Sequence, residues 1–190
     1  MKCKLKETLK KRFKGHNEEL LAKIILFAVK KDKIRYEEIK IQDSFKVDLL
    51  MLLEKEKILI PLKTSKTLAW EDRILTFKPG EIYEIPHVIR YLIRKADETG
   101  EWNPDYAVKS YLKEIGEPEP EKITTFFNKV KENMKQNKIT PEILIKVSDE
   151  LNLRSKIGTI IAELKGGGII SPCLRDLSQL RYEVNPSLII

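Results

Sequence analysis

Several features that define whole classes of protein are missing from this sequence. Among its 190 residues, no apolar run approaches the roughly 18–20 residues that cross a bilayer, and no apolar stretch follows the basic N-terminus as a signal peptide requires. Glycine occurs eight times and proline nine times, which excludes collagen-like and low-complexity chains. The sequence therefore predicts a protein without membrane segments, folded as one large domain or two small ones.

Cysteine and histidine are also scarce. Cys3 and Cys173 form no CxxC motif, so we expect reduced thiols in a cytoplasmic protein, with Cys173 a buried apolar side chain. His16 and His87 lack metal-ligand spacing, and no GxGxxG, P-loop or GxSxG motif occurs. Acidic pairs are adjacent in sequence rather than convergent. We therefore predict that the protein is not an enzyme and that it uses no metal or cofactor.

The positive charge is concentrated in one segment. The net charge is +7, and residues 1–16 contain seven basic side chains against Glu7 alone, so this segment supplies six of the seven charges. The rest of the chain is nearly neutral, so a polyanion that contacts only the basic segment would bind weakly and without specificity. The composition, rich in lysine, glutamate and isoleucine and poor in glutamine, resembles that of a thermophile's cytoplasmic protein.

The basic segment also carries an apolar pattern. Leu5, Leu9 and Phe13 recur every four residues, which predicts a helix with one narrow apolar stripe. Three alternatives fit: the stripe packs on the protein body, the segment lies along a phosphate backbone, or it lies on a membrane surface. The candidate phosphate contacts are Lys10, Lys11, Arg12 and Lys14.

Apolar spacing and capping residues predict a mainly helical chain with short strands. Helices are expected at 17–31, 36–39, 43–57, 86–100, 103–116 and 121–136, then from 140 and from 152 or 155 onward. Strands are expected at 58–62, 67–70, 73–77, 169–172 and 182–184. Glu117–Glu121, with its alternating prolines, cannot lie in the middle of a helix and is the best candidate for a linker.

The order of elements near the C-terminus is the most informative pattern. The runs KIGTIIAELK (156–165), GIISP (168–172) and YEVNP (182–186) place a third helix before two short strands. This pattern resembles that of archaeal and bacterial winged-helix regulators, although the Gly166–Gly168 run is longer than the single glycine usual there. Residues 17–80 repeat the order more loosely. The chain therefore resembles an uncharacterised archaeal protein built of two winged helices.

The resemblance implies an α+β fold that is mainly α with small β-hairpins, in which two winged-helix units are joined by a helical segment. The corresponding divisions are a basic N-terminal segment (1–16), a first unit (17–85), a helical connector (86–117) and a second unit (118–190).

The third helix of the second unit is a candidate for reading DNA. Its apolar residues share one face, and its other face and its start carry small, polar and basic side chains that suit a major groove. An ordinary solvated helix face is the alternative, because Glu163 repels phosphate. The candidate DNA contacts are Arg154, Ser155, Lys156 and Thr159 on this helix, with Arg175 and Arg181 in or beside the wing.

The third helix of the first unit differs, because apolar residues occupy every face between Val47 and Leu53. A helix that reads bases would carry Arg, Lys, Asn or Gln outward. We therefore expect a homodimer, with Leu50, Met51 and Leu53 as candidate interface residues.

Two functions remain open at this point. The first is a DNA-binding protein, similar to transcription regulators, whose partner is double-stranded DNA. The second is a winged-helix module that binds another protein in a larger assembly without reading DNA. Near-neutral charge outside residues 1–16 supports the second, and acidic side chains around the third helix of the second unit would favour it further.

Overall fold

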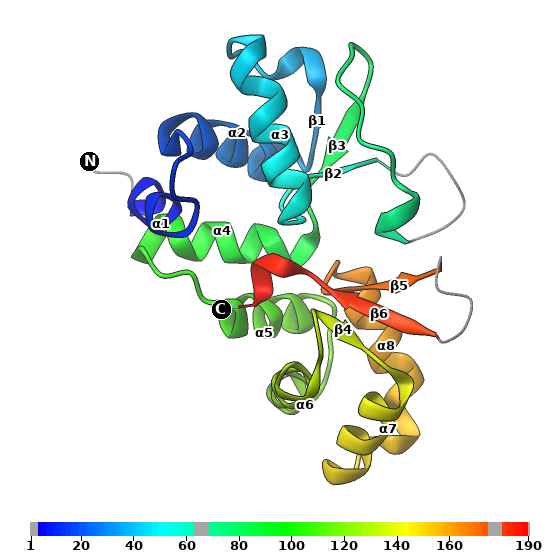
Figure 1. The fold of residues 1–190 in the computed structure, drawn as a ribbon. Helices are drawn as coiled ribbons and strands as arrows, with labels where there is room; N and C mark the ends of the chain where they lie inside the picture. Colours follow the sequence, from blue (N-terminus) through cyan, green and yellow to red (C-terminus); the bar gives the residue numbers. More distant parts are fainter. Residues whose placement is uncertain (1–3, 63–68, 175–179, 190) are drawn as a thin grey trace.

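The computed structural model describes residues 4–62, 69–174 and 180–189 (Figure 1). Two groups of helices and short strands lie on either side of α4 (His87–Thr99) and α5 (Pro104–Glu114). At one end, α1 (Lys4–Arg12) packs against α4 and against α2 (Glu18–Lys31). The predicted class, mainly helical with small groups of antiparallel strands, is confirmed.

The first unit contains one three-stranded antiparallel sheet with the strand order β1-β3-β2. Ile34 on the edge strand lies opposite Tyr83 on the central strand, and both side chains are buried. After α2, its elements are β1 (Lys33–Arg35), a short 3-10 helix (Tyr36–Glu38), α3 (Asp43–Lys55), β2 (Ile60–Pro61), a second 3-10 helix (Trp70–Asp72) and β3 (Ile82–Glu84).

The second unit repeats this topology, with the sheet order β4-β6-β5. Ile139 on the edge strand lies opposite Tyr182 on the central strand, the same pairing of residue types as in the first unit. In both units, the strand that comes last in the sequence therefore lies in the middle of the sheet. The elements are α6 (Pro120–Asn133), β4 (Lys138–Ile139), α7 (Pro141–Glu150), a 3-10 helix (Arg154–Lys156), α8 (Ile157–Gly166), β5 (Ile170–Cys173) and β6 (Arg181–Val184).

The helices α2 and α5 begin at the capping residues that the sequence predicts, whereas α3 begins after Gln42 and α8 after Lys156 rather than at their expected caps. Asn17 precedes α2, and its Oδ1 accepts hydrogen bonds from the N–H groups of Glu19 and Leu20 at 3.1 and 3.0 Å. Asn103 caps α5 in the same way, with Pro104 in the first turn. None of the helices that the structure describes is long and apolar enough to span a bilayer.

Some strand predictions for the first unit are wrong. Trp70 lies in a 3-10 helix, and residues 73–77 form no strand, whereas 67 and 68 lie outside the described residues. The sequence pattern also does not reveal β1, β3 and β4, which are two or three residues long. Strands this short have no readable alternation and are stabilised by the strands beside them.

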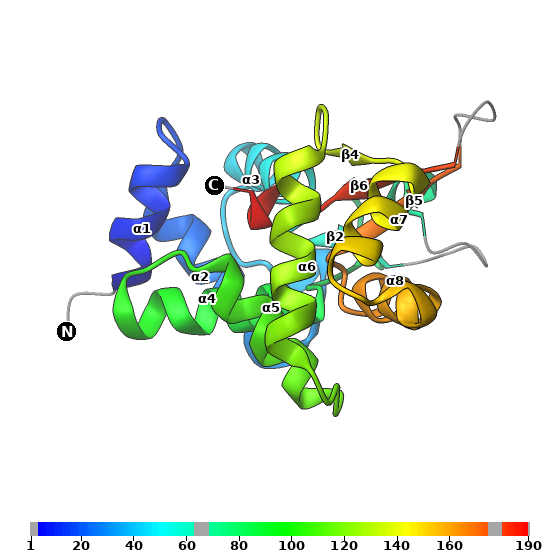
Figure 2. The same cartoon turned by 90° about the horizontal axis from the view of Figure 1, so that it is seen from below.

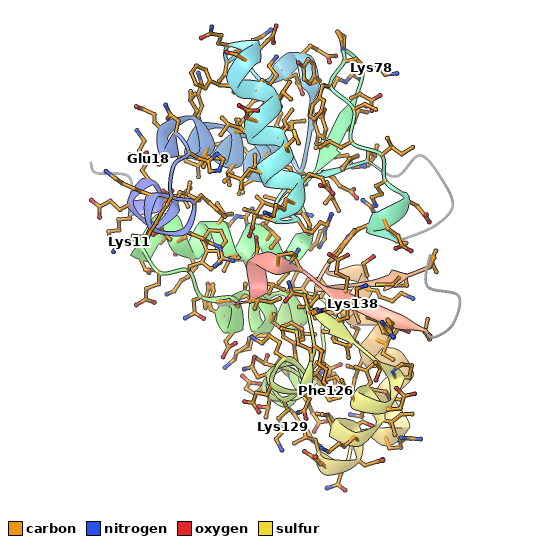
Figure 3. The ribbon with its side chains drawn as sticks, viewed as in Figure 1. Lys11, Glu18, Lys78, Phe126, Lys129 and Lys138 are labelled. Atoms are coloured by element: carbon orange, nitrogen blue, oxygen red, sulfur yellow. The ribbon has the colours of Figure 1, made fainter. Side chains whose placement is uncertain are left out.

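One continuous hydrophobic core joins both units and the helices between them. Leu5, Leu9 and Phe13 of the basic N-terminal segment are buried in it, as is Phe126 of α6, which Figure 3 labels in the second unit. The stripe of α1 therefore packs on the body of the protein, the first of the three alternatives considered for this segment.

Two of the three candidate interface residues belong to this core. Leu50 and Leu53 are 1% and 0% exposed within one chain, so the prediction that they contact a second chain is wrong. The chain folds back directly after α3, and the N–H groups of Ile58 and Leu59 donate to the carbonyl of Leu53. That return covers the α3 face, whereas Met51 remains 54% exposed.

A run of three glycines allows the second unit to approach the connecting helices closely. A Cβ atom at Gly167 would lie 2.5 Å from Cε1 of Tyr111, and one at Gly168 would lie 2.6 Å from Cβ of Pro86. Gly168 also has a φ of +71°. The sequence pattern does not explain why this glycine run is long. The structure does, because side chains at Gly167 and Gly168 would collide with Tyr111 and Pro86.

Buried hydrogen bonds add to this contact between the units. The N–H of Trp70 donates to Oγ of Ser171 at 2.9 Å. Asn185 is fully buried, and its Nδ2 donates to the carbonyls of Lys57 and Gly168 at 3.2 and 3.1 Å. These bonds fix the end of β6 against the segment that follows α3.

Candidate nucleic-acid interface

α8 exposes the face that the sequence predicts. Ile160 and Leu164 are buried on its inner side, where the core stripe was expected. The outer side of α8 is small and uncharged, with Gly158, Thr159 and Ala162 exposed, which permits close approach of another surface. The preceding 3-10 helix adds three exposed residues, Arg154, Ser155 and Lys156.

Both cations at the start of α8 are paired with carboxylates. Nζ of Lys156 lies 2.5 Å from Oε2 of Glu119, and Nη1 of Arg154 lies 3.4 Å from Oδ2 of Asp149. The hydrogen bond between Lys156 and Glu119 raises the pKa of the lysine and lowers the pKa of the carboxyl. A phosphate must therefore compete with these carboxylates, although exposed pairs are individually weak.

Further acidic groups surround Lys156. Glu163 projects from α8 itself, and burial, followed by the charge of Glu117, raises the pKa of its carboxyl. Together with Glu119, these carboxylates make the start of α8 acidic. Such a surrounding favours a protein contact over a phosphate contact at this point of the helix.

A basic hollow of about 710 Å³ lies between the end of α6, the start of α7 and the strands β4 and β6. Lys135, Lys138 and Arg181 provide its charge, and no acidic side chain is among the described residues that line it. Asn133 and Thr140 add polar groups. The hollow therefore attracts anions, in contrast to the start of α8.

A tight turn places the two lysines of the hollow. Gln136 and Asn137 have positive φ angles of 49° and 61°, and the N–H of each flanking lysine donates to the carbonyl of the other. This is a two-residue hairpin turn with left-handed central residues, a conformation that Asn tolerates well. The N–H of Val184 donates to the carbonyl of Asn137 and ties the turn to β6. Figure 3 labels Lys138 on β4.

Sequence reasoning identified only one side chain of this hollow, Arg181. Arg181 begins β6 opposite Cys173, and its side chain is partly buried. Lys135 and Lys138 were missed, although residues 129–138 hold four lysines against Glu132 alone. That local excess of lysine was the sequence feature that could have predicted a basic surface here. Arg175, the other candidate near the wing, lies outside the described residues.

The candidate phosphate contacts of the N-terminal segment lie elsewhere. Lys10, Lys11 and Lys14 are exposed, and α1 lies at the opposite end of the molecule from α8 (Figures 1 and 2). Lys11 is labelled there in Figure 3. The structure therefore does not bring these lysines onto one face with α8.

Arg12 has a structural role that the sequence pattern does not predict, and its contact with a phosphate backbone stays a prediction. Its Nη2 donates to the carbonyls of Pro186 and Ile189 at 3.1 and 3.2 Å and lies 3.7 Å from Oε2 of Glu56. Its guanidinium carbon lies 4.9 Å from the ring centre of Trp102. Burial lowers the pKa of Arg12, against the opposing effect of Glu56. These contacts hold the C-terminal segment.

Two further kinds of functional group were considered from the sequence, namely thiols and metal ligands. Cys173 is a buried free thiol, as predicted, and burial, with smaller effects of Glu183 and Glu71, raises its pKa. In the described part of the chain, no group of three or more His, Cys, Asp and Glu side chains is arranged to hold a metal ion.

Comparison with known proteins gives one result. A protein-family model matches residues 4–190, and the function of that family is unknown. No curated protein matches the chain, and no solved structure matches it. The candidate interface is therefore interpreted from the chemistry of its own residues.

Proposed function

We propose that this chain, which belongs to the family whose model spans residues 4–190, binds double-stranded DNA and regulates transcription. One observation carries the proposal: Lys135, Lys138 and Arg181 surround a hollow that no carboxylate of the described residues lines. Clustered cations of this kind bind phosphates of the DNA backbone, and such contacts supply most of the affinity for a duplex.

The topology supports an assignment of both units as winged helices. In that fold a three-helix core precedes a β-hairpin, the order of α6, α7 and α8 before β5 and β6. The first unit has the same order, with a 3-10 helix as its second helix. The matching sheet orders and the matching Ile–Tyr pairs favour two copies of one fold over two unrelated groups.

Within this proposal, α8 contributes base contacts and the hollow contributes phosphate contacts. Ser155 and Thr159 are exposed hydroxyls able to hydrogen-bond base edges, and Gly158 leaves room for close approach. Lys156 takes part by exchanging its carboxylate partner Glu119 for a phosphate or a base.

The experiment compares two double variants of equal charge change in duplex titrations over a range of salt concentrations. Lys135→Ala with Lys138→Ala should flatten the dependence of log K on log salt by about 2, because each lost phosphate contact contributes about 0.9. Lys129→Ala with Lys146→Ala is the control, since both lysines lie in the second unit outside the hollow, and its slope should not change. An equal loss in both variants, or no duplex binding by the wild type at low salt, would overturn the proposal.

A second function, binding of a protein, is favoured by α3. Phe45 and Met51 are 49% and 54% exposed there, beside the exposed carboxylates of Asp43 and Asp48. The carboxylates repel a phosphate backbone and the apolar side chains offer it no hydrogen-bond donor, whereas both suit contact with a protein. A second copy of this chain is the simplest such partner.

This second proposal is tested by light scattering. The wild type should be a dimer, and Phe45→Ser with Met51→Ser should convert it to a monomer. Ile145→Ser on α7, which removes another exposed apolar side chain, is the control and should leave the dimer intact. A monomeric wild type at high concentration would contradict the proposal.

A further inference from the structure

A second hollow, of about 350 Å³, lies between the two units. The 3-10 helix Trp70–Asp72 of the first unit packs against β5 of the second at its edge (Figure 1). Residues of both units line it, among them Lys33 and Arg73 from the first and Lys165 and Ile170 from the second. Its volume lies within the range of sites that bind small molecules. We call it the inter-unit cleft.

Cations exceed carboxylates in the inter-unit cleft. Among the described residues, four cationic side chains line it against the carboxylates of Asp32 and Glu84, which leaves an excess of two positive charges. Nη1 of Arg90 lies 2.5 Å from Oδ1 of Asp32, and Arg73 is paired with Glu84. The other two cations have no ion-pair partner among the described residues. The four cations are Lys33, Arg73, Arg90 and Lys165.

Both arginines of the cleft keep an unused donor. The side chain of Arg73 is only 8% exposed and that of Arg90 is 18% exposed. The Nε atom of each is buried and has no hydrogen-bond partner among the described residues. A buried N–H without an acceptor is unfavourable, so a ligand oxygen that met either Nε after a small shift of its side chain would remove that cost.

Apart from His87, the other side chains that line the described part of the cleft are apolar. Ile60 and Trp70 of the first unit face the same hollow as Ile170 and Pro172 of the second. Trp70 is 4% exposed, so its indole is held in place by the contact between the units. A flat apolar group can pack against this wall while an attached anion reaches the cations.

We infer that the inter-unit cleft binds a small phosphate monoester whose body is an aromatic or similarly apolar ring. A dianion balances the excess of two positive charges, and phosphate oxygens satisfy both arginine and lysine donors. The ring occupies the wall formed around Trp70. This inference does not depend on DNA binding, because the cleft uses none of the residues that we place in the DNA contact; Lys165 lies at the end of α8 and is not among them.

Phenyl phosphate is the probe that contains both parts, and titration calorimetry at pH 8, where the phosphate is a dianion, measures its binding. It should bind one site per chain at least about tenfold more tightly than inorganic phosphate or benzyl alcohol, which contain one part each. Because the cleft joins the two units, bound probe should also raise the melting temperature. Equal affinity for inorganic phosphate, or no binding at millimolar concentration, would overturn the inference.

The location is tested with a matched pair of double variants. Lys33→Ala with Lys165→Ala removes one cleft cation from each unit and should weaken the probe at least about tenfold. Lys30→Ala with Lys146→Ala removes one exposed lysine from each unit outside the cleft, and its affinity should stay within about twofold of wild type. Equal losses in the two variants would show that general charge, rather than the cleft, attracts the probe.

Discussion

Single carboxylates determine which basic side chains of this protein are available to bind an anion. Glu119 holds Lys156 at the start of α8, and Glu56 lies beside Arg12, so cations that the sequence presents as available already have partners. Glu183 is different, because burial raises the pKa of its carboxyl and the charges of Lys57 and Lys138 only partly oppose this. Each of these carboxylates can be neutralised by a change to glutamine of nearly the same shape.

Glu119→Gln should strengthen duplex binding if α8 contacts DNA. The change removes the hydrogen-bonded carboxylate that raises the pKa of Lys156, and it leaves the ammonium free for a phosphate. The salt dependence should steepen by about 0.9 for the added contact. Glu101→Gln, at an exposed site of the connector, is the control. Unchanged duplex affinity in Glu119→Gln would place α8 outside the DNA contact.

Glu183→Gln should stabilise the protein at neutral pH. A carboxyl whose pKa is raised on folding binds protons more tightly in the native state, so its charged form lowers stability above that pKa. The melting temperature of the variant should exceed that of wild type at pH 7. This advantage should shrink as the pH falls toward about 3, where the carboxyl is largely protonated in both states. A constant difference across this range would contradict the cause given.

The elements of the structure depend on a few close contacts between helices. α1 is joined to the body by an apolar stripe, and α8 ends in glycines that meet Tyr111 of α5 and Pro86 before α4. Lys10 and Lys11 of α1 are exposed, and so is the small outer face of α8. Packing and surface chemistry can therefore be changed separately within one helix.

Gly167→Ala should lower the free energy of unfolding by about 1–3 kcal/mol, the usual cost of overpacking. The backbone φ of −74° accepts alanine, so the effect comes from the Cβ contact 2.5 Å from the buried ring of Tyr111. Gly158→Ala is the matched control on the same helix, with nothing within 4 Å of the new Cβ. It should stabilise by about 0.5–1 kcal/mol. Chemical denaturation measures both, and the same sign for both would contradict the packing argument.

On α1, the apolar stripe and the lysines should have separate effects. Leu9→Ala should cost about 2–5 kcal/mol of stability, because Leu9 is fully buried. Lys10→Gln, Lys11→Gln and Lys14→Gln combined should leave the melting temperature near that of wild type, since all three are exposed. If α1 contributes to polyanion binding, the same triple variant should flatten its salt dependence. A large loss of stability in the triple variant would be the opposite of what the burial pattern implies.

At the scale of the whole molecule, the two units share one core and a set of buried hydrogen bonds. Asn185 and Trp70 connect the second unit to the first, and the hydrophobic cluster continues from α1 to β6. The division at residue 117 that the sequence predicts therefore separates two copies of one topology but not two separate cores. The inter-unit cleft exists only because of this contact.

Thermal unfolding should occur in one transition. Residues of both units lose their contacts together, so the calorimetric and van't Hoff enthalpies should agree. Asn185→Ala should lower the free energy of unfolding by about 1–3 kcal/mol, because it leaves the buried carbonyls of Lys57 and Gly168 without their donor. The whole transition should therefore move to lower temperature. Two resolved transitions, only one of which Asn185→Ala shifts, would show that the units unfold independently.

Local sequence determined the parts of this protein that depend on local energies. Asn17 and Asn103 fix helix starts through their own side chains, and the spacing of Ile160 and Leu164 fixes which side of α8 is buried. The order of elements in the second unit could also be read from its runs of residues. Even the exposed face of α8 follows from that spacing.

Only the tertiary structure decided what depends on distant partners. Strands as short as β1 and β4 form because a central strand from 40 or more residues away pairs with them, which no local pattern records. Leu50 and Leu53 are covered by the chain that returns after α3, so an all-round apolar helix did not imply a second chain. The pairing of Lys156 with Glu119, the hollow around Lys135 and Lys138, and the cleft between the units arise in the same way, because charge and burial depend on neighbours that folding brings together.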